Sequence, residues 1–222
     1  MNKDRLRITD DGSHTLFSNN VGENYHSSFG AIQESKHIFI NAGLATVDVK
    51  NLKRVNVLEV GTGTGLNIVL AYLWGKKNNA VVKYDGYEPF PISTNEVALL
   101  NYPTQLFVDD ELFYHIHDNF GKVVKLSEEF SLLINEDEIQ NSKLDDNYYD
   151  VVFFDAFSPD SQPEMWTADV FMKIFNSLKS RGVLTTYSCK GIVKRALIEA
   201  GFTIEKLPGP PGKREFLRAW KK

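Results

Sequence analysis

The sequence predicts an α/β protein with a mainly parallel sheet that is covered by helices on both faces. From residue 55 onward, short apolar segments alternate with segments of helical periodicity, as in parallel strands joined by crossover helices. A glycine-rich turn at 61–65 separates the first such strand from the first helix. The segment VVFFD, residues 151–155, has the β-branched and aromatic residues of a buried strand and ends on a carboxylate.

The alternation places each element along the chain. Helices are predicted at 66–74, 93–101, from 167 and at 192–201, and residues 104–127 are predicted to be helix and loop. Ser93 and Glu96 have the spacing of a capping box, and Thr167 is expected to cap the helix whose inner face is Val170, Phe171, Ile174, Phe175 and Leu178. Gly182 is expected to open the fifth strand. Strands are predicted at 55–60, 81–88, 130–135, 151–155, 183–188, 202–207 and 215–220.

The first 45 residues are expected to form a separate layer packed on this fold. Alternating residues around Asp11 and Gly12 predict a hairpin, and Ile32, Ile38 and Phe39 predict a short helix ending near Gly43. We therefore expect an extension at 1–45 and a main domain at 46–222.

Composition indicates a soluble protein of the cytoplasm without a membrane partner. The start of the chain lacks the apolar core of a signal peptide, and no apolar stretch is long enough for a membrane helix. Cys189 is the single cysteine, which fits a reducing compartment, and no His/Cys cluster predicts a metal site. The net charge is −4, yet residues 190–222 hold nine Lys/Arg against three Glu, so a local basic face for nucleic acid remains possible.

The glycine loop predicts a nucleotide-type cofactor. In LEVGTGTGLN, Gly61, Gly63 and Gly65 let the backbone turn sharply before a helix N-terminus. A dinucleotide fingerprint would need glycine where Leu66 stands. With Glu59 at the strand end, the pattern instead resembles motif I of class I S-adenosylmethionine-dependent methyltransferases, which implies S-adenosylmethionine as the cofactor.

Acids that close the following strands complete the expected cofactor site. Glu88 ends the second strand, where a carboxylate accepts hydrogen bonds from ribose hydroxyls, and it is preferred over Asp85 because Pro89 follows it. Beyond the third strand, the family places an acidic or polar residue against the adenine. Asp137 is chosen for that position over Glu136.

Asp155 is the predicted catalytic residue. Its strand lies next to the first strand in the family's sheet, so the carboxylate is expected to contact the cofactor as well as the methyl acceptor. The following residues, AFSP, do not match the Pro-Pro-aromatic motif of base-amine methyltransferases. A carboxylate instead suits an alkylamine, which is protonated at neutral pH and must lose a proton before it attacks a methyl group.

Nearly the whole chain, from Asp11 to Trp220, resembles one known family. The segments YHSSFGAIQESKHIFI, LEVGTGTGLN, FFDAFSPDSQPEMWT and GKREFLRA are similar to the methyltransferase domain of the bacterial bifunctional tRNA wobble-uridine enzymes. The resemblance implies a seven-stranded sheet with its last strand antiparallel, and methyl transfer to 5-aminomethyl(-2-thio)uridine in the tRNA anticodon loop. Because no flavin oxidoreductase domain follows residue 222, separate enzymes are expected to supply that aminomethyl-uridine.

Other residues of these segments are candidates for binding the substrate. Tyr25, His26 and Phe29 are expected to stack on or hydrogen-bond the uridine, with Phe157 covering it and Trp166 shaping the wall. Glu34 and Ser35 are candidates for the cofactor mouth. Lys213 and Arg214 belong to a basic rim suited to phosphates, which also includes Lys190, Lys194 and Arg195.

Two alternatives remain open at this point. One is a different enzyme of the same fold, either a small-molecule amine methyltransferase or an aminopropyltransferase. The other is a non-catalytic tRNA-binding subunit that retains the fold.

Overall fold

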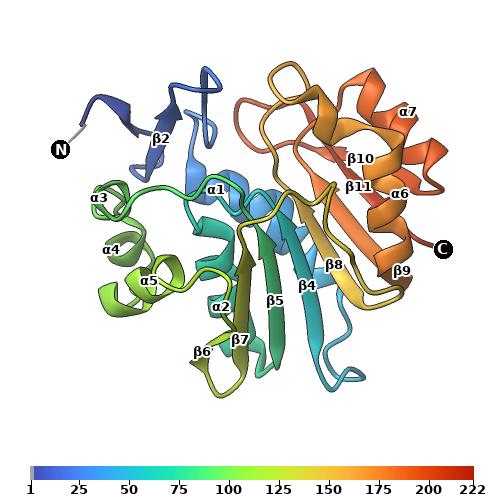
Figure 1. The fold of residues 1–222 in the computed structure, drawn as a ribbon, viewed down its shortest axis with the longest axis horizontal. Coiled ribbons are helices and arrows are strands. Elements are labelled where there is room, and N and C mark those ends of the chain that lie inside the picture. The colour runs from blue at the N-terminus through green and yellow to red at the C-terminus, as the bar shows by residue number, and fades with distance from the viewer. Residues whose placement is uncertain (1–2) are drawn as a thin grey trace.

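A twisted eight-stranded sheet forms the centre of the molecule (Figure 1). The computed structural model describes residues 3–222. The strand order is β10-β11-β9-β8-β4-β5-β7-β6, with parallel pairing from β9 through β7 and antiparallel pairing at β11 and at β6. The strands are β4 (Val55–Val60), β5 (Val82–Tyr87), β6 (Val124–Ser127), β7 (Phe130–Asn135), β8 (Tyr149–Phe154), β9 (Leu178–Thr186), β10 (Thr203–Pro208) and β11 (Glu215–Trp220).

All seven predicted strands are present, and the predicted α/β methyltransferase-type sheet is confirmed, with β11 antiparallel to β9. The edge strand β6 is an addition within residues that were predicted to be helix and loop. It has only four residues, and its pairing with β7 shifts register between Lys125 and Ser127. Such a short, irregular strand gives little alternation in the sequence.

Alternating side chains of the central strands pack into two separate hydrophobic cores, one on each face of the sheet. Val57 of β4 and Phe153 of β8 point into the core beneath α2 (Leu66–Asn78). Leu58 and Phe154 point into the opposite core, beneath α6 (Ala168–Ser177) and α7 (Gly191–Glu199), which lie together on that side in Figure 1. Because both faces are covered, β4 and β8 are buried at every position, as parallel strands usually are.

The predicted helix starts are confirmed. The Thr167 hydroxyl accepts a hydrogen bond from the Val170 N–H, and Ser93 and Glu96 form a capping box at the start of α3 (Thr94–Val97). Leu178 differs from the prediction because it begins β9 instead of closing α6, so β9 starts before Gly182. Two further helices, α4 (Tyr102–Leu106) and α5 (Asp110–His117), follow.

The N-terminal segment forms a small antiparallel sheet at one end of the molecule. Its strands are β1 (Leu6–Ile8), β2 (His14–Ser18) and β3 (Glu23–Asn24), preceded by a 3₁₀ turn at Lys3–Arg5. The hairpin predicted around Asp11 and Gly12 joins β1 to β2. Of the predicted extension at 1–45, residues 1 and 2 lie outside the described residues.

The helix predicted to end near Gly43 is divided into three parts. It runs as α1 (Ala31–Ser35), continues as a π-helix at Lys36–Asn41 and is followed by a 3₁₀ turn at Leu44–Thr46. Three consecutive residues, Ile38, Phe39 and Ile40, are buried, which a regular amphipathic α-helix with one buried face does not achieve.

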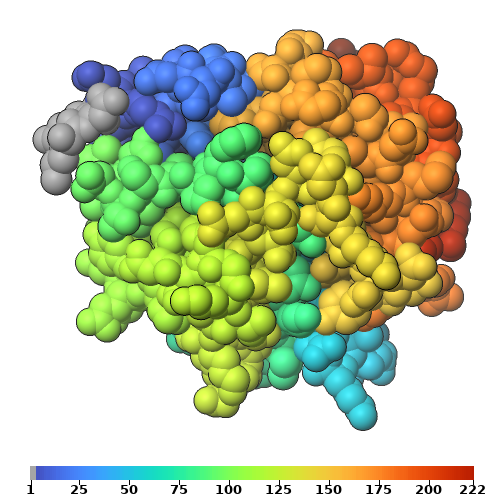
Figure 2. Space-filling view, in the orientation of Figure 1, coloured from blue at the N-terminus to red at the C-terminus, as the bar shows by residue number. Residues whose placement is uncertain are grey.

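The N-terminal sheet lies at the carboxyl ends of the central strands. Figure 2 shows its blue surface meeting the green segment that follows β5 and the orange segment that follows β8. Asn101, before α4, accepts a hydrogen bond from the His14 N–H at 2.8 Å and donates one to the Gly12 carbonyl at 3.0 Å. Across residues 3–222, every helix is too short or too polar to cross a membrane.

Packing around Phe154 generates a stability prediction. Its buried ring lies 4.9 Å from the ring centroids of both Trp166 and Phe171. Phe154→Ala is expected to lower the free energy of unfolding by about 3 to 5 kcal/mol, because it leaves a cavity among rigid aromatic neighbours. Urea denaturation measures this loss. The control Phe107→Ala, at a ring that is 95% exposed, should change the unfolding free energy by less than about 0.5 kcal/mol. Equal losses in the two variants would contradict this packing.

Candidate active site

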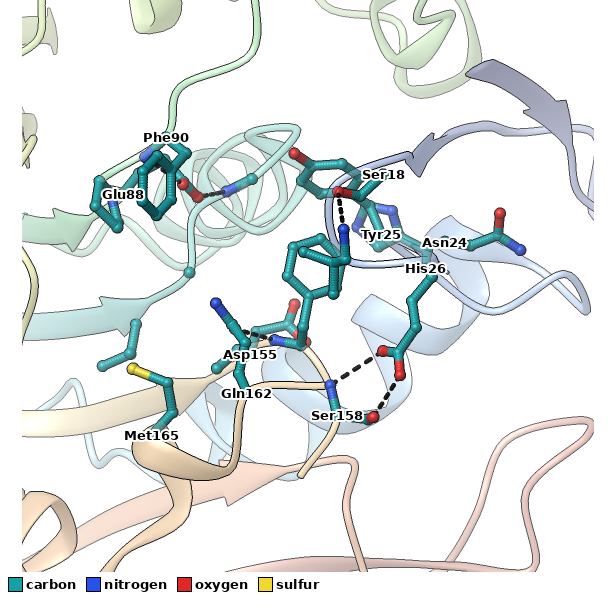
Figure 3. A pocket seen from close by; sticks show the side chains of 18 of the residues that line it. Ser18, Asn24, Tyr25, His26, Glu88, Phe90, Asp155, Ser158, Gln162 and Met165 are labelled. Atoms are coloured by element: carbon teal, nitrogen blue, oxygen red, sulfur yellow. Dashed lines mark hydrogen bonds between the residues drawn. The ribbon is translucent and has the colours of Figure 1, made fainter. Parts of the chain in front are cut away.

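A cavity of about 660 Å³ opens at the carboxyl ends of β4, β5 and β8. In Figure 3, Glu88 and Phe90 lie on one side of it, Tyr25 and His26 on the other, and Asp155 between them. The N-terminal segment therefore contributes one wall, and the loops after the central strands contribute the rest. This edge of an open α/β sheet is where such folds bind ligands.

The glycine loop closes the end of β4 against its neighbours. Gly61 has a φ of +84°, and a Cβ atom there would lie 2.7 Å from the carbonyl oxygen of Asp155. At Gly63 a Cβ would lie 2.8 Å from the ring of Tyr25. Both positions thus require glycine, because backbone and ring approach where a side chain would stand.

Glu88 joins the glycine loop to the end of β5. Its carboxylate accepts hydrogen bonds from the Gly63 N–H at 2.7 Å and the Phe90 N–H at 3.1 Å. Burial raises its pKa, and the two backbone donors oppose that rise. Asp85, the competing candidate, lies further back in β5 and accepts a hydrogen bond from Tyr149. The strand-end acid that faces the cavity is therefore Glu88.

Asp155 shares a buried amide with Glu59. The Asn67 side-chain nitrogen, at the start of α2, donates to Asp155 Oδ2 at 3.0 Å and to Glu59 Oε1 at 2.8 Å. The Tyr84 hydroxyl donates to the other Glu59 oxygen at 2.8 Å. Glu59 is fully buried behind the glycine loop, whereas Asp155 lines the cavity.

The surroundings of Asp155 make its carboxylate unusually basic. Burial, then the negative charge of Glu34, raises the pKa of Asp155 to about 8, against the opposing effects of Asn67 and Lys213. Burial also raises the pKa of Glu59 to about 8. A carboxylate with such a pKa accepts a proton far more readily than an ordinary aspartate at neutral pH.

A second carboxylate and an ammonium group lie in the same cavity wall. Glu34, from α1, pairs with the Lys213 ammonium at 2.8 Å and accepts a hydrogen bond from the Ser27 N–H, also at 2.8 Å. The Lys213 Nζ lies 4.5 Å from the ring centroid of Tyr187.

A cluster around Glu23 fastens the N-terminal segment to the loop that follows Asp155. The Glu23 carboxylate accepts hydrogen bonds from the Ser158 N–H and hydroxyl, drawn as dashed lines at Ser158 in Figure 3, and from the Ser161 hydroxyl. Burial pushes the Glu23 pKa up, but these donors outweigh it and lower the pKa below its usual value. The Tyr25 and Phe157 rings meet edge-on at 5.0 Å, so the contact is both polar and aromatic.

His26 is held as a neutral imidazole. Burial lowers its pKa to about 4, and its Nδ1 lies 3.1 Å from the Thr15 hydroxyl. A charged histidine is therefore excluded near neutral pH, and hydrogen bonding is the chemistry that this side chain can offer.

The structure brings eight of the predicted site residues to the cavity and leaves six away from its lining. Glu59 and Gly65 lie behind the loop, Trp166 is buried and donates its indole N–H to the Phe157 carbonyl at 2.8 Å, and Phe29, Asp137 and Arg214 are exposed. Beyond β7 the lining comes from Glu138, Ile139 and Gln140 instead of Asp137. The predicted site residues that do line the cavity are Tyr25, His26, Gly61, Gly63, Glu88, Asp155, Phe157 and Lys213.

Asn67, Glu23 and Tyr187 are site residues that the sequence did not reveal. Asn67 follows the glycine loop at the helix start, so its position near an acid was inferable from topology. Glu23 and Tyr187 contact the loop after β8 from segments more than 25 residues away in the sequence. Glu23 accepts a hydrogen bond from Ser158, and the Tyr187 hydroxyl donates one to the Ala156 carbonyl at 2.9 Å. Such contacts leave no local pattern.

Comparison with known proteins agrees with this geometry. The family described as S-adenosyl-L-methionine-dependent methyltransferase matches residues 115–222. The tRNA 5-methylaminomethyl-2-thiouridine biosynthesis bifunctional protein MnmC of Aromatoleum aromaticum is 30% identical, over 96% of this chain and 35% of that protein. Its namesake from Acinetobacter baylyi is 29% identical, over 94% of this chain and 36% of that protein. The crystal structure of MNMC2 from Aquifex aeolicus superposes with a TM-score of 0.81 at 27% identity, covering 98% of this chain and 70% of that one.

Residues 115–222, just under half of the chain, thus match the S-adenosyl-L-methionine-dependent methyltransferase family, and nearly the whole chain has the fold of the solved MNMC2. The predicted relationship to the methyltransferase domain of MnmC is confirmed, although the chain spans about a third of the length of the curated relatives that it matches. Spermidine synthase from Thermotoga maritima, at a TM-score of 0.53 and 11% identity, shares only the fold with this chain.

The cavity fits S-adenosyl-L-methionine, the cofactor of the matched family. Gly61 and Gly63 present bare backbone, and the Glu88 carboxylate is held at the rim by two backbone N–H groups. A carboxylate that is fixed in this way suits a pair of ribose hydroxyls. When bound, the cofactor supplies a methyl group on a positively charged sulfur.

Glu88 provides a test of cofactor binding. Glu88→Gln is expected to raise the Kd for S-adenosylhomocysteine about tenfold or more, since hydrogen bonds to a charged acceptor are lost. Isothermal titration calorimetry measures the change. Asp137→Asn serves as the matched control, because its side chain is exposed outside the cavity lining. A larger effect at Asp137 would restore it as the contact.

Asp155 provides a test of the raised pKa. Between the unfolded value of about 4 and the folded value of about 8, the native carboxyl retains a proton that the unfolded chain releases, so wild-type stability falls as pH rises. Asp155→Asn lacks this titration. The unfolding free energy of Asp155→Asn minus that of the wild type should therefore increase between pH 5 and 8, by at most about 1.4 kcal/mol per pH unit. Urea denaturation across that range measures the gain, and a pH-independent difference would contradict it.

Proposed function

We propose that this protein is a methyltransferase that transfers a methyl group from S-adenosyl-L-methionine to the primary amine of 5-aminomethyl(-2-thio)uridine at the tRNA wobble position. The observation that carries the proposal is Asp155, a basic carboxylate in the same cavity as the Gly61–Gly63 loop and Glu88. The MnmC relatives, whose names specify tRNA 5-methylaminomethyl-2-thiouridine biosynthesis, support the choice of acceptor.

The chemistry of a primary amine matches this carboxylate. An alkylammonium has a pKa of about 10.4, so its nitrogen has no free electron pair at neutral pH. With a pKa of about 8, Asp155 is a stronger base than an ordinary aspartate of pKa about 3.9, which makes proton transfer from the ammonium less unfavourable. The positive charge of the bound ammonium favours the ionised form of Asp155, which would otherwise keep its proton near neutral pH. The ionised carboxylate binds the ammonium, orients its nitrogen towards the methyl donor and takes up the released proton.

The remaining cavity residues have supporting roles in this proposal. Asn67 fixes the Asp155 carboxylate from behind, and Trp166 anchors the Phe157 carbonyl. The aromatic pair Tyr25–Phe157 lies at the mouth, where a splayed base could stack. Neutral His26 offers a hydrogen bond to the base edge.

We extend the proposal to the setting of the reaction. The exposed Arg214, together with exposed Lys190 and Arg195, is assigned to phosphates of the anticodon stem-loop. Because this site consumes an existing amine, separate enzymes are assigned to make the aminomethyl group. A tRNA substrate places the protein in the cytoplasm. We retain 1–45 as an extension of the domain at 46–222, since strands β1, β2 and β3 form a sheet of their own.

Methyl transfer itself is the decisive test. Bulk tRNA from cells that lack 5-methylaminomethyl modification should accept labelled methyl groups, whereas polyamine and metabolite mixtures should not. Asp155→Asn should lower kcat by about a hundredfold or more while S-adenosylhomocysteine binding stays close to wild type, because a proton acceptor is lost and the cofactor contacts remain. Asp137→Asn is the control for charge loss. Transfer to polyamines instead of tRNA would overturn the proposed acceptor, and full activity in Asp155→Asn would overturn its role.

A further inference from the structure

The cavity already contains one primary ammonium, that of Lys213. It pairs with Glu34 Oε1 at 2.8 Å, with the Lys213 and Glu34 side chains 27% and 9% exposed. The Tyr187 ring flanks the same ammonium at 4.5 Å. A carboxylate and an aromatic face around one cation form a recognisable ammonium site.

Asp155 belongs to the same electrostatic cluster. The charge of Glu34 raises the pKa of Asp155 after burial itself, while the charge of Lys213 lowers it. Tyr187 is fixed by its hydroxyl, which donates to the carbonyl of Ala156, the residue next to Asp155. Two carboxylates therefore face a single protein cation in this wall.

The two partners of the pair differ in mobility. Glu34 lies in helix α1 and is held through its second oxygen by the Ser27 N–H at 2.8 Å. Lys213 lies in the turn between β10 and β11, where its backbone N–H bonds to the Pro210 carbonyl at 2.9 Å. Its ammonium sits at the end of a flexible four-carbon chain. Glu34 is thus the fixed half of the site, and Lys213 is the half that can leave.

We propose that Lys213 occupies the amine subsite of the empty enzyme and is displaced by the substrate's primary ammonium, which makes Lys213 a specificity residue. The inference rests on the proposed amine acceptor. A lysine side chain and an aminomethyl group both end in –CH₂–NH₃⁺, so a site that fits one fits the other. An RNA that lacks the amine offers no replacement cation, and removing Lys213 would leave Glu34 as a buried, unpaired charge.

The effect of Lys213→Met on RNA preference tests whether the substrate displaces Lys213. We would measure Kd values, with S-adenosylhomocysteine present, for an anticodon stem-loop that carries 5-aminomethyluridine and for the same RNA with uridine. The preference of Lys213→Met for the aminated RNA should exceed that of wild type by about fivefold, because the internal competitor is gone. Glu34→Gln should abolish the preference, while its amide oxygen still accepts the Ser27 N–H.

Arg214→Met is the matched control, since Arg214 is the positively charged neighbour of Lys213 in the sequence and its side chain is exposed. Arg214→Met should weaken the binding of both RNAs to the same extent and leave the preference for the aminated RNA unchanged. If Lys213→Met behaves in the same way, Lys213 is a phosphate contact and the inference is overturned. An unchanged preference with unchanged affinities overturns it equally.

A second measurement does not depend on tRNA. Propylammonium should bind Lys213→Met about fivefold more tightly than it binds wild type by calorimetry, whereas neutral propanol should bind both equally weakly. Absence of this gain overturns the inference even if tRNA is methylated. If propylammonium binding improves but aminomethyl-tRNA is not methylated, the amine subsite stands and the proposed function fails.

Discussion

The site depends on two neighbouring parallel strands that end at the same level of the sheet. Val60 of β4 pairs with Phe154 of β8, and the Asp155 N–H continues the ladder by donating to the Val60 carbonyl at 2.9 Å. Gly61, the residue that follows β4, approaches the Asp155 carbonyl so closely that a Cβ atom would lie 2.7 Å from it. The cofactor loop and the acid are therefore held side by side by backbone pairing, and Glu88 is added from the adjacent strand β5 in the same way.

This arrangement opposes the stability of the folded chain. Burial raises the pKa values of Glu59, Glu88 and Asp155, which means that each charged form is disfavoured in the native state. One amide, that of Asn67, serves both Glu59 and Asp155, while its own oxygen is buried without a hydrogen-bond partner in the described part of the chain. Strain of this kind is common where a site needs a perturbed group. Here it yields a carboxylate that is basic enough to hold a proton from an amine.

Sequence reasoning succeeded where a strand end fixes the position of a residue. Gly61, Glu88 and Asp155 each follow a well-defined strand, so the order of the sheet was enough to bring them together. It was less successful beyond β7, where the chain runs on from Asn135 and Asp137 lies outside the lining. The Glu34–Lys213 pair joins residues 179 positions apart, and no local pattern in either segment indicates it. Lys213 was predicted to lie on a basic rim that contacts phosphates, whereas the structure places it in the cavity lining.

The balance of charge across the cavity links these features. Methyl transfer from a sulfonium to an ammonium begins with two positive charges on the reactants and ends with one on the product amine and one released proton. Glu34 forms an ion pair with Lys213, and in the proposed displacement it pairs with the substrate's ammonium instead. In the proposed reaction, the substrate's ammonium favours the ionised form of Asp155, and the raised pKa of this carboxyl then lets it take up that proton. In the proposed reaction, one carboxylate, Glu34, selects the amine, and a second carboxylate with a raised pKa, Asp155, receives its proton.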